Sequence, residues 1–420
     1  MSRTTDRMAK RRMRRRALPA LAAAGAWAMI TCGPAVAAPA ADVQAKQWYL
    51  KAMHAETIWK TTTGEGVKVA VIDSGVNPST PSLQGQVLKG KDLTGIQGDE
   101  TDDYTGHGTS MAELIAGTGK GGGLKGLAPG AKIIPYRVSD TELQNNNKVN
   151  AFDVQQAIRA AADSDARIIS MSWGSEYYIS DIRDAVEYAQ AKGKLFFAAA
   201  GNTGDKANKE EYPAAYPEAV AVAASGPDGR VLKYSQHGEF VDIAAPSGVL
   251  PRWCDENFAS YCDGHGGTSS ATAIASASAA LIWSKHPDWT GNQVLRVMFE
   301  SAGRGEGWKP GTVSNYLGHG IVRPGAHINR GLGKPGDPNV TPLTNERVGG
   351  ATASPAPSAP DASKTPGGRP GSDAVAAGSG KQAAQPSEDG GTWGLVLGGA
   401  AAAVVVAGAV FLVARRRRNA

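Results

Sequence analysis

The sequence predicts an α/β fold, in which a mostly parallel sheet carries helices on both faces. Three observations lead to this prediction. Between about residues 38 and 331, short apolar segments of strand type alternate with longer segments whose apolar residues recur at helical spacing. Apolar residues make up 41% of the chain, enough for a large buried core. Glycine is abundant, at 53 residues, and aromatic residues are few, at 6%, which suits a close-packed protein with many glycine turns.

The expected elements follow one another as strand, helix, strand through most of this body. Strands are expected at residues 67–75, 131–138, 166–174, 194–202, 219–225 and 241–246. Helices are expected at residues 107–117, 150–164, 181–193 and 269–286. In parallel sheets of this kind, binding and chemistry collect at the carboxyl ends of the strands.

The N-terminus has the three parts of a secretory signal peptide, predicted over residues 1–37. Residues 1–16 are rich in Arg and Lys, residues 17–30 are apolar, and Ala35-Val36-Ala37 offers a small-x-small cleavage site. The alternative is an uncleaved signal anchor. After cleavage, residues 38–63 would remain as an N-terminal extension that packs on the body.

The C-terminus has the features of a membrane anchor. Residues 393–414 carry no charge and would form a helix about 33 Å long, enough to cross a hydrocarbon core of about 30 Å. Four arginines follow in the tail at 415–420, and positive charge favours the cytoplasmic side. The alternative is a buried core helix. Residues 332–392, rich in Pro, Ala, Gly, Ser and Asp, are expected to be a flexible linker. These features predict a single-pass type I protein of the cell membrane with its folded body outside the cytoplasm.

Charge and cysteine content exclude some functions. The net charge is +5, but much of the excess lies at the two ends and the middle is close to neutral, so nucleic-acid binding is not indicated. Cys32 lies in the predicted leader, which leaves Cys254 and Cys262 as a pair. In an exported protein this pair predicts a disulfide that pins a loop, the alternative being two free thiols. Two cysteines fall short of a structural zinc site, and no metal or other cofactor is expected.

Four polar residues stand where predicted strands end or helices begin. Asp73 and Asn202 end strands, and His107 and Ser269 open helices. A Ser that attacks, a His that takes its proton and an Asp that orients the His are the parts of an acyl-transfer site. An amide such as that of Asn202 stabilises the oxyanion. Each residue alone has a common structural explanation, because an Asp at a strand end is usually a turn or cap and a lone His is usually structural. The four together, in this order, are specific.

The segments around these residues resemble, in family order, the motifs of the subtilisin-like serine proteases. VAVIDSGV contains Asp73, GHGTSMAELIAG contains His107, AAAGN ends at Asn202, and GGTSSATA contains Ser269. The resemblance implies that Asp73, His107 and Ser269 are catalytic and that Asn202 is the oxyanion donor. It also implies the subtilisin-like three-layer fold for a protease domain at 64–331.

Further segments extend this resemblance over most of the body. GLAPGAKIIPYRV, YPAAYPEAVAVAA and VDIAAP are similar to core segments of the family. SMSWG is similar to the strand that pairs with bound substrate. The resemblance therefore implies that Ser172, Trp173 and Gly174 add a strand edge to the substrate backbone.

Two segments share the tripeptide Gly-Thr-Ser, so two serines compete for the role of nucleophile. Ser110 lies three residues after His107, one turn along the same predicted helix. The resemblance assigns the nucleophile to Ser269 and a helix position beside the histidine to Ser110. The helix N-terminus at Ser269 also favours developing negative charge, and the backbone N–H of Ser269 can join Asn202 as an oxyanion donor.

The chain departs from the family at two positions near the site. Glu113 replaces a frequent Gly six residues after His107, which puts the local packing in question, and Ala273 replaces a common Pro four residues after Ser269. Two further features have ordinary explanations. His265 is interpreted as a polar loop residue. The acids between Asp99 and Asp103 are interpreted as a solvated loop, with calcium binding or a preference for basic substrates as the alternatives.

Within the family, the layout resembles the mycosins, membrane-anchored proteases of actinobacterial type VII secretion systems. The stretch QWYLKAMHAETIWKTTTGEG and the cysteine loop are also similar to theirs. The resemblance implies a membrane-anchored extracytoplasmic serine endopeptidase that acts on a protein or peptide and has type VII secretion components as partners. The alternative is a mainly structural subunit of the secretion complex with minor proteolytic activity.

Overall fold

The computed structural model describes residues 43–147, 153–305, 308–309 and 311–348. The chain forms two units, Met1–Ser354 and Pro355–Ala420, and every described residue belongs to the first. The predicted signal peptide, membrane helix and basic tail lie outside the described residues, as does most of the predicted linker. Within the described part, no helix is both long and apolar enough to cross a membrane.

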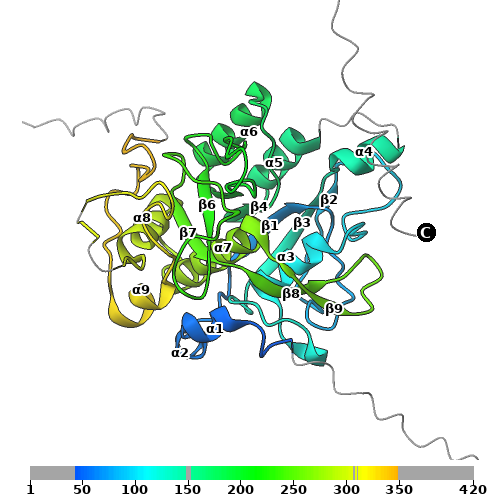
Figure 1. Cartoon of the computed structure of the whole chain (residues 1–420), viewed down its shortest axis with the longest axis horizontal. Helices are drawn as coiled ribbons and strands as arrows, with labels where there is room; N and C mark the ends of the chain where they lie inside the picture. Colours follow the sequence, from blue (N-terminus) through cyan, green and yellow to red (C-terminus); the bar gives the residue numbers. More distant parts are fainter. Residues whose placement is uncertain (1–42, 148–152, 306–307, 310, 349–420) are drawn as a thin grey trace, which may run out of the picture. The chain divides into compact units, whose positions relative to one another are not determined.

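A seven-stranded parallel sheet forms the centre of the described part (Figure 1), with the strand order β2-β3-β1-β4-β5-β6-β7. The strands are β1 (Lys68–Asp73), β2 (Lys91–Asp92), β3 (Lys132–Arg137), β4 (Ile168–Met171), β5 (Leu195–Ala199), β6 (Val220–Ser225) and β7 (Ile243–Pro246). Six of them fall within the predicted strand segments, and β2 does not. The parallel α/β sheet that the sequence predicts is thereby confirmed.

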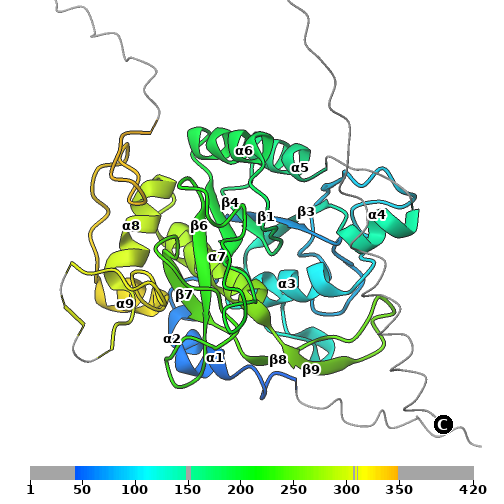
Figure 2. The same cartoon turned by 45° about the horizontal axis from the view of Figure 1, so that its top comes forward.

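Helices cover both faces of this sheet, and in the central strand β1 alternate residues enter two separate cores. Val69 and Val71 of β1 pack with α3 (His107–Ala116), α7 (Gly267–Lys285) and α8 (Gly291–Ser301). Ala70 and Ile72 pack on the other face with α5 (Asp153–Asp163) and α6 (Ser180–Ala191). Figure 2 shows α5 and α6 together on one side of the strands, with α3 and α7 on the other. This period of two is the expected geometry of a strand buried on both faces.

Helix α7 is the central helix of the larger core. It contacts β4, β5, β6 and β7 and also the helices α3, α8 and α9 (Pro324–Arg330). Sixteen of its residues, Thr268 to Trp283, are buried, including polar ones such as Ser276 and Ser278. A helix buried all round needs small side chains, and the Ala- and Ser-rich sequence provides them. The helix carries Ser269 in its first turn.

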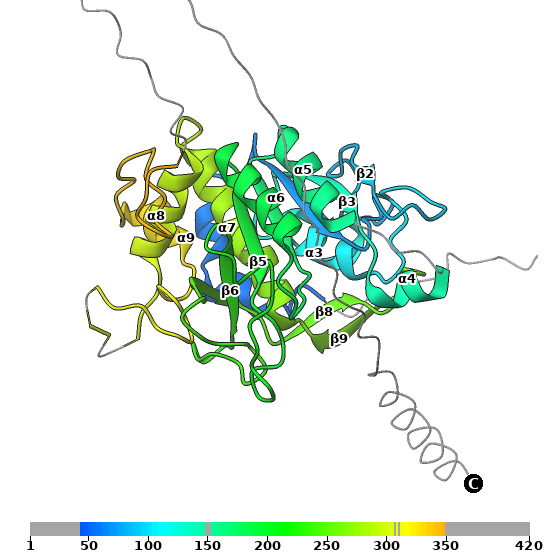
Figure 3. The same ribbon diagram turned by 90° about the horizontal axis from the view of Figure 1, so that it is seen from above.

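A two-stranded antiparallel hairpin, which sequence reasoning did not predict, precedes α7. Its strands are β8 (Val249–Trp253) and β9 (Tyr261–His265), and β8 packs against α3 (Figures 1 and 3). Trp253 stacks on Tyr261 with ring centroids 3.9 Å apart. The hairpin thus joins the helix that begins at His107 to the helix that carries Ser269.

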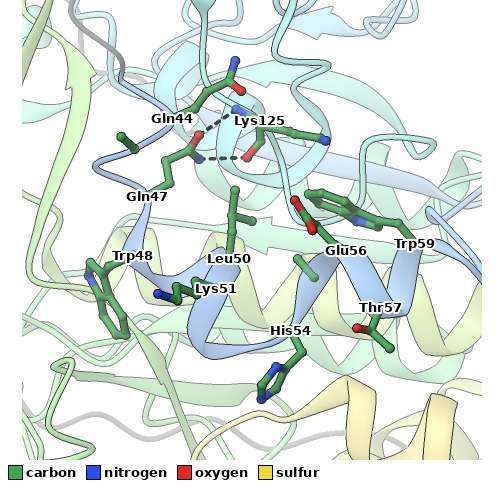
Figure 4. Close-up of a pocket in the computed structure, with 12 residues that line it drawn as sticks. Gln44, Gln47, Trp48, Leu50, Lys51, His54, Glu56, Thr57, Trp59 and Lys125 are labelled. Atoms are coloured by element: carbon green, nitrogen blue, oxygen red, sulfur yellow. Dashed lines mark hydrogen bonds between the residues drawn. The ribbon is translucent and has the colours of Figure 1, made fainter.

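Residues 43–63 lie against the body and contribute to its core. They contain α1 (Trp48–Ala52) and α2 (Ala55–Trp59). Tyr49 and Ile58 are fully buried in the same apolar cluster as α7. Gln47 accepts a hydrogen bond from Lys125 N at 2.9 Å and donates one to Lys125 O at 2.8 Å (Figure 4). A groove of about 720 Å³ runs beside the two helices, and Trp48 is among the residues that line it.

The folded part extends further than the predicted boundary at residue 331. Within 332–348, Thr341 is buried and Leu343 packs against the main core. Pro338 O accepts hydrogen bonds from Thr290 Oγ1 at 3.1 Å and from Asn292 Nδ2 at 2.9 Å. The first residues of the predicted flexible linker are therefore part of the packed body. Composition does not reveal this, because the segment is held through its backbone carbonyl groups and few apolar side chains.

Candidate active site

The predicted catalytic residues converge at the carboxyl edge of the sheet. Asp73 is the last residue of β1, and Asn202 follows the end of β5. His107 is the first residue of α3, and Ser269 lies in the first turn of α7. Because β1, β4 and β5 are parallel neighbours, their carboxyl ends meet at one edge. The segment Ser172–Gly174 leaves this edge directly after β4.

Asp73 and His107 form a direct hydrogen bond, with Asp73 Oδ1 2.7 Å from His107 Nδ1. The carboxylate is buried and also accepts a hydrogen bond from Ser74 N at 2.8 Å. Desolvation of the imidazole lowers the pKa of His107, but the charge and the hydrogen bond of Asp73 outweigh this effect. The pKa of His107 is therefore held above its ordinary value. The arrangement favours the tautomer that carries its proton on Nδ1 and leaves Nε2 as the base.

Glycine at position 108 allows α3 to approach β1 closely enough for this bond. A β-carbon at Gly108 would lie 2.1 Å from Gly75 O and 3.0 Å from Asp73 Cβ. No side chain fits in that space. The His-Gly pair in the sequence is thus explained by the close contact between a strand end and a helix start.

Asp103 holds the first turn of α3, a role that sequence analysis missed. Its Oδ1 accepts from Gly106 N at 2.9 Å and from Ser74 Oγ at 2.7 Å. Its Oδ2 accepts from Thr109 N at 2.8 Å and from Thr109 Oγ1 at 2.6 Å. Asp103 is 4% exposed. The interpretation of residues 99–103 as a solvated loop is therefore wrong for Asp103, whose carboxylate caps the N–H groups of the helix that begins at His107.

Ser269 is buried in the first turn of α7 and faces Ser172 of the Ser172–Gly174 segment. Its Oγ lies 3.5 Å from Ser172 O, and Ser172 Oγ lies 3.4 Å from Ser269 O, both at the long limit of hydrogen bonding. Within the described residues, no hydrogen bond joins Ser269 Oγ to His107. Catalytic hydrogen bonds are often long before a substrate binds.

Asn202 is held by the residue that precedes the predicted nucleophile. Its Oδ1 accepts hydrogen bonds from Thr268 N at 2.8 Å and from Thr268 Oγ1 at 3.3 Å. Thr268 Oγ1 in turn accepts from Gly201 N at 3.1 Å. With its oxygen engaged in this way, Asn202 can present Nδ2 to a developing oxyanion. Gly267 has a φ of +61°, and a β-carbon there would lie 3.0 Å from Asn202 Oδ1, so glycine suits the turn into α7.

A cleft of about 300 Å³ opens beside His107. Its lining includes both members of the Asp73–His107 pair, together with Tyr104, Ser172 and Trp173. Trp173 is half-buried against the core that contains α5 and α6. A substrate can therefore lie against the Ser172–Gly174 segment while it faces the imidazole.

Ser110, the other serine in a Gly-Thr-Ser tripeptide, has a structural role. Its hydroxyl donates to Gly106 O at 2.6 Å and accepts from Trp253 N at 3.0 Å, and its side chain is buried. It therefore anchors the β8–β9 hairpin on α3. This geometry leaves Ser269 as the candidate nucleophile of the two.

Glu113, the departure from the family pattern, has a defined place in the packing of α3. Its carboxyl group is fully buried, accepting from Thr80 Oγ1 at 2.9 Å and from Tyr261 OH at 2.7 Å. Burial raises the pKa of Glu113 to about 7. The second departure, Ala273, is buried within α7. Neither residue disturbs the contact between Asp73 and His107.

The remaining candidates lie away from the reacting groups. His265 is exposed on β9, with its ring 6.3 Å from that of Tyr234, so it is part of a strand and not of a loop. Among the described residues, no group of three or more His, Cys, Asp or Glu side chains could hold a metal ion.

Cys254 and Cys262 lie at the hairpin and are free thiols in the structure. Hydrogen bonding to Cys254 raises the pKa of Cys262, so the two side chains are neighbours. The predicted disulfide is not formed here and stays a prediction.

Comparisons with known proteins agree with this geometry. The subtilase family (peptidase S8) matches residues 64–320. Thermitase of Thermoactinomyces vulgaris is 33% identical over 279 residues, which cover 64% of this chain and 95% of thermitase. The crystal structure of MycP1 from Mycobacterium smegmatis is 25% identical with a TM-score of 0.56, over 67% of this chain and 84% of that one. The MycP3 protease from the type VII (ESX-3) secretion system is 29% identical with a TM-score of 0.56, over 69% of this chain and 90% of that one.

These matches bear out the resemblance that the motifs indicate. The family match covers both the strand that ends at Asp73 and the helix that begins near Ser269. The mycosins MycP1 and MycP3 are among the solved structural neighbours, which supports the predicted subgroup. The chain belongs to the subtilase family of serine endopeptidases.

Proposed function

We propose that the chain cleaves peptide bonds with a catalytic triad of Asp73, His107 and Ser269. The observation that carries this proposal is the 2.7 Å hydrogen bond between Asp73 and His107 at the sheet edge where α7 presents Ser269. A buried carboxylate that fixes one imidazole nitrogen leaves the other to serve as the base.

The reaction proceeds through an acyl-enzyme. Ser269 Oγ attacks the peptide carbonyl carbon and gives its proton to His107 Nε2, forming a tetrahedral intermediate. The negative oxygen is held by Asn202 Nδ2 and by the backbone N–H of Ser269, at the N-terminus of α7. His107 then protonates the leaving amine as the C–N bond breaks. Water, deprotonated by the same imidazole, attacks the acyl-enzyme, and the proton returns to Ser269 as the acid product leaves.

Asp73 stabilises the imidazolium formed in each half of the reaction. The raised pKa of His107 has the same origin, because Asp73 favours the charged form of the ring. Ser172, Trp173 and Gly174 hold the substrate backbone as an added strand.

Labelling with a fluorophosphonate probe tests this proposal on the full chain. Peptide mapping should find the phosphonyl group on Ser269, and the Ser269→Ala and His107→Ala variants should not react. Removing the nucleophile should lower kcat by about 10⁶-fold, the loss known from subtilisin. Ser110→Ala is the matched control, since its serine lies in the same tripeptide, and it should react normally. Labelling that persists in Ser269→Ala, or that maps to Ser110, would overturn the assignment.

The same proposal includes a site of action. We propose that residues 393–414 anchor the enzyme in the cell membrane with the protease domain outside the cytoplasm. We also propose that the enzyme works with a type VII secretion system. The membrane anchor is supported by the uncharged C-terminal segment and the arginines that follow it. The secretion partner is supported by the likeness to MycP3, a protease of such a system.

The likeness to a component of a secretion system also favours a second candidate, a structural subunit whose proteolysis is minor. The Ser269→Ala variant separates the two functions in the native host. If secretion stops, the reaction itself is required. If secretion continues while cleavage is lost, the structural role is the main one.

A further inference from the structure

We infer that Glu211 makes this enzyme select peptides in which Lys or Arg supplies the scissile carbonyl. The inference rests on the proposed function, because it places the substrate by the roles assigned to Ser269, Asn202 and the Ser172–Gly174 segment.

Glu211 lies between the two backbone segments that flank the reacting carbonyl. Tyr212 exchanges hydrogen bonds with Ser175, N to O at 2.8 and 2.9 Å, which brings residue 211 beside the substrate-strand segment. A β-carbon at Gly174 would lie 2.7 Å from Glu211 Oε2. A β-carbon at Gly201 would lie 2.8 Å from Glu211 Cδ. The carboxylate thus touches both the segment that holds substrate and the segment that ends at the oxyanion donor.

The two backbone positions that approach the carboxylate, 174 and 201, are glycines, so no side chain at either position stands between it and a bound peptide. Gly174 follows Ser172 and Trp173, and Gly201 precedes Asn202. A larger residue at either position would collide with Glu211, or with Gln236 beside it. The two glycines therefore permit this approach of the carboxylate.

The position of the attacked carbonyl fixes which substrate residue meets Glu211. The carbonyl carbon must lie at Ser269 Oγ, and its oxygen must point to Asn202. The chain before that carbonyl runs along the Ser172–Gly174 edge. The side chain of the residue that supplies the carbonyl is then directed between Gly174 and Gly201, where Glu211 lies.

The charge at this position has no basic partner within the described residues. Among them, no Lys or Arg forms an ion pair with Glu211, although the side chain is half-buried. The nearby cation, Lys209, pairs instead with Glu176 at 2.6 Å. Loss of hydration raises the pKa of Glu211, and the negative charge of Glu176 raises it further. An ammonium or guanidinium group from a substrate would relieve both effects and form a charge-assisted hydrogen bond.

The acidic segment 99–103 is a poorer source of such a preference. The buried acid, Asp103, already accepts hydrogen bonds from Gly106 N and Thr109 N at the start of α3. Asp99 accepts from Thr101 within its own turn at 2.7 Å, and Asp102 accepts from Asp99 N at 2.9 Å. Glu211, by contrast, has no basic partner among the described residues and lies beside Gly174 and Gly201.

The test compares two peptidyl diphenyl phosphonates that differ at one side chain, lysine against the uncharged norleucine. Each would be reacted with the full chain in detergent micelles, and the rate of Ser269 modification measured. The lysine reagent should react at least about tenfold faster, because a close charge pair is worth more than about 1.4 kcal/mol. Glu211→Gln should remove most of this ratio. Glu211→Lys should reverse it toward a reagent carrying glutamate.

The matched control is Glu210→Gln, which removes the same charge one residue away on an exposed side chain and should keep the ratio. The wild-type ratio is measured without any variant, so the inference stays testable if Glu211→Gln does not fold. Equal rates for lysine and norleucine in the wild type, or an unchanged ratio in folded Glu211→Gln, would overturn it.

A fluorophosphonate without an amino-acid side chain separates this inference from the function on which it rests. If that probe labels Ser269 while the lysine reagent has no advantage, only the role of Glu211 is wrong. If the probe does not label Ser269, the proposed triad fails, and the inference fails with it.

Discussion

Thr268 shows how a single residue without chemistry of its own can position a reacting group. Its N–H and hydroxyl both hold Asn202 Oδ1, and its hydroxyl accepts from Gly201 N. These contacts orient the Asn202 amide and the backbone that leads to it. Sequence analysis identified Asn202 and Ser269 but not Thr268, because a threonine beside a nucleophile carries no signal of what its hydroxyl contacts.

The Thr268→Val variant keeps the shape of the side chain and removes the hydroxyl. We expect kcat to fall by about tenfold while KM changes little, because the amide acts mainly in the transition state. The loss should be smaller than that of Asn202→Ala, which we expect to be about 10²–10³-fold. Steady-state kinetics on a peptide substrate measures both values.

A double-variant cycle is the control for that interpretation. If Thr268 acts through Asn202, adding Thr268→Val to Asn202→Ala should cost little more activity. An equal loss in both backgrounds would mean that Thr268 contributes independently of Asn202.

Asp103 shows the limit of sequence reasoning at the same scale. The run of acids from residue 99 to 103 has the composition of a solvated loop, and Asp99 and Asp102 are exposed, as such a loop requires. Asp103 is buried because the end of β1 and the start of α3 meet around it. The Asp73–His107 pair, proposed as catalytic, was predictable from local motifs, whereas this contact of Asp103 depends on segments that meet only in the fold.

At the scale of elements, the β8–β9 hairpin connects α3 and α7, the helices that carry His107 and Ser269. It is bonded to α3 through Ser110 and Glu113 and leads directly into α7. The buried Glu113 carboxyl therefore controls how the hairpin docks. Its neighbours in this contact, Thr80, Tyr261 and Trp253, carry no charge at neutral pH, so ionisation of Glu113 is not compensated.

Glu113 should make the stability of the protein depend on pH. In the folded state it keeps its proton up to a pKa of about 7, whereas in the unfolded chain it loses it near 4.5. The folded state binds more protons between these values, so this group lowers the free energy of unfolding as the pH rises, by up to about 3 kcal/mol. We expect wild type to lose about this much relative to Glu113→Gln between about pH 4.5 and pH 7. Urea unfolding of wild type and of Glu113→Gln, at each end of this pH range, measures the difference in their free energies of unfolding.

Glu256→Gln is the matched control, since Glu256 lies in the same hairpin but is exposed. Its stability difference from wild type should be nearly independent of pH. A Glu113→Gln difference that is equally flat would mean that the carboxyl group is ionised or solvated in the folded protein.

The elements that could be predicted are those that can be recognised from their own residues, without knowledge of what they contact in the fold. The strands β1 and β3–β7 and the helices α3, α5, α6 and α7 are continuous apolar or periodic segments, and they were predicted. The hairpin was missed because neither strand is a continuous buried segment. No residue of β9 is buried, and β8, whose first residue is exposed, packs against α3, which is distant in sequence. Helix α8 did carry a local signal that was not used, a capping box in which Thr290 accepts from Gln293 N.

At the scale of the whole described body, the larger core is completed by residues that precede the subtilase match. Tyr49 and Ile58 lie in the same cluster as α7, and Trp59 Nε1 donates to Leu127 O at 2.8 Å. Gly325 of α9 approaches Ile58 so closely that a β-carbon there would lie 3.3 Å from Ile58 Cδ1. The residues before position 64 are therefore part of the hydrophobic core. Thr62 Oγ1 donates to Ser284 Oγ at 3.0 Å near the C-terminal end of α7, at the opposite end of that helix from Ser269.

This packing predicts a large effect on stability and little effect on chemistry when Ile58 is truncated. Ile58→Ala should lower the free energy of unfolding by about 2–5 kcal/mol, because it leaves a cavity in a fully buried cluster. Thr57→Ala, at the exposed neighbouring position, is the control and should change stability by less than about 0.5 kcal/mol. Urea unfolding followed by tryptophan fluorescence measures the stability. The fraction of folded molecules that a fluorophosphonate labels measures whether the active site is intact.

If Ile58→Ala were as stable as the control, residues 43–63 would not be packed firmly on the body. If the folded molecules of Ile58→Ala are labelled to the same extent as folded wild type, the extension stabilises the body without shaping the active site.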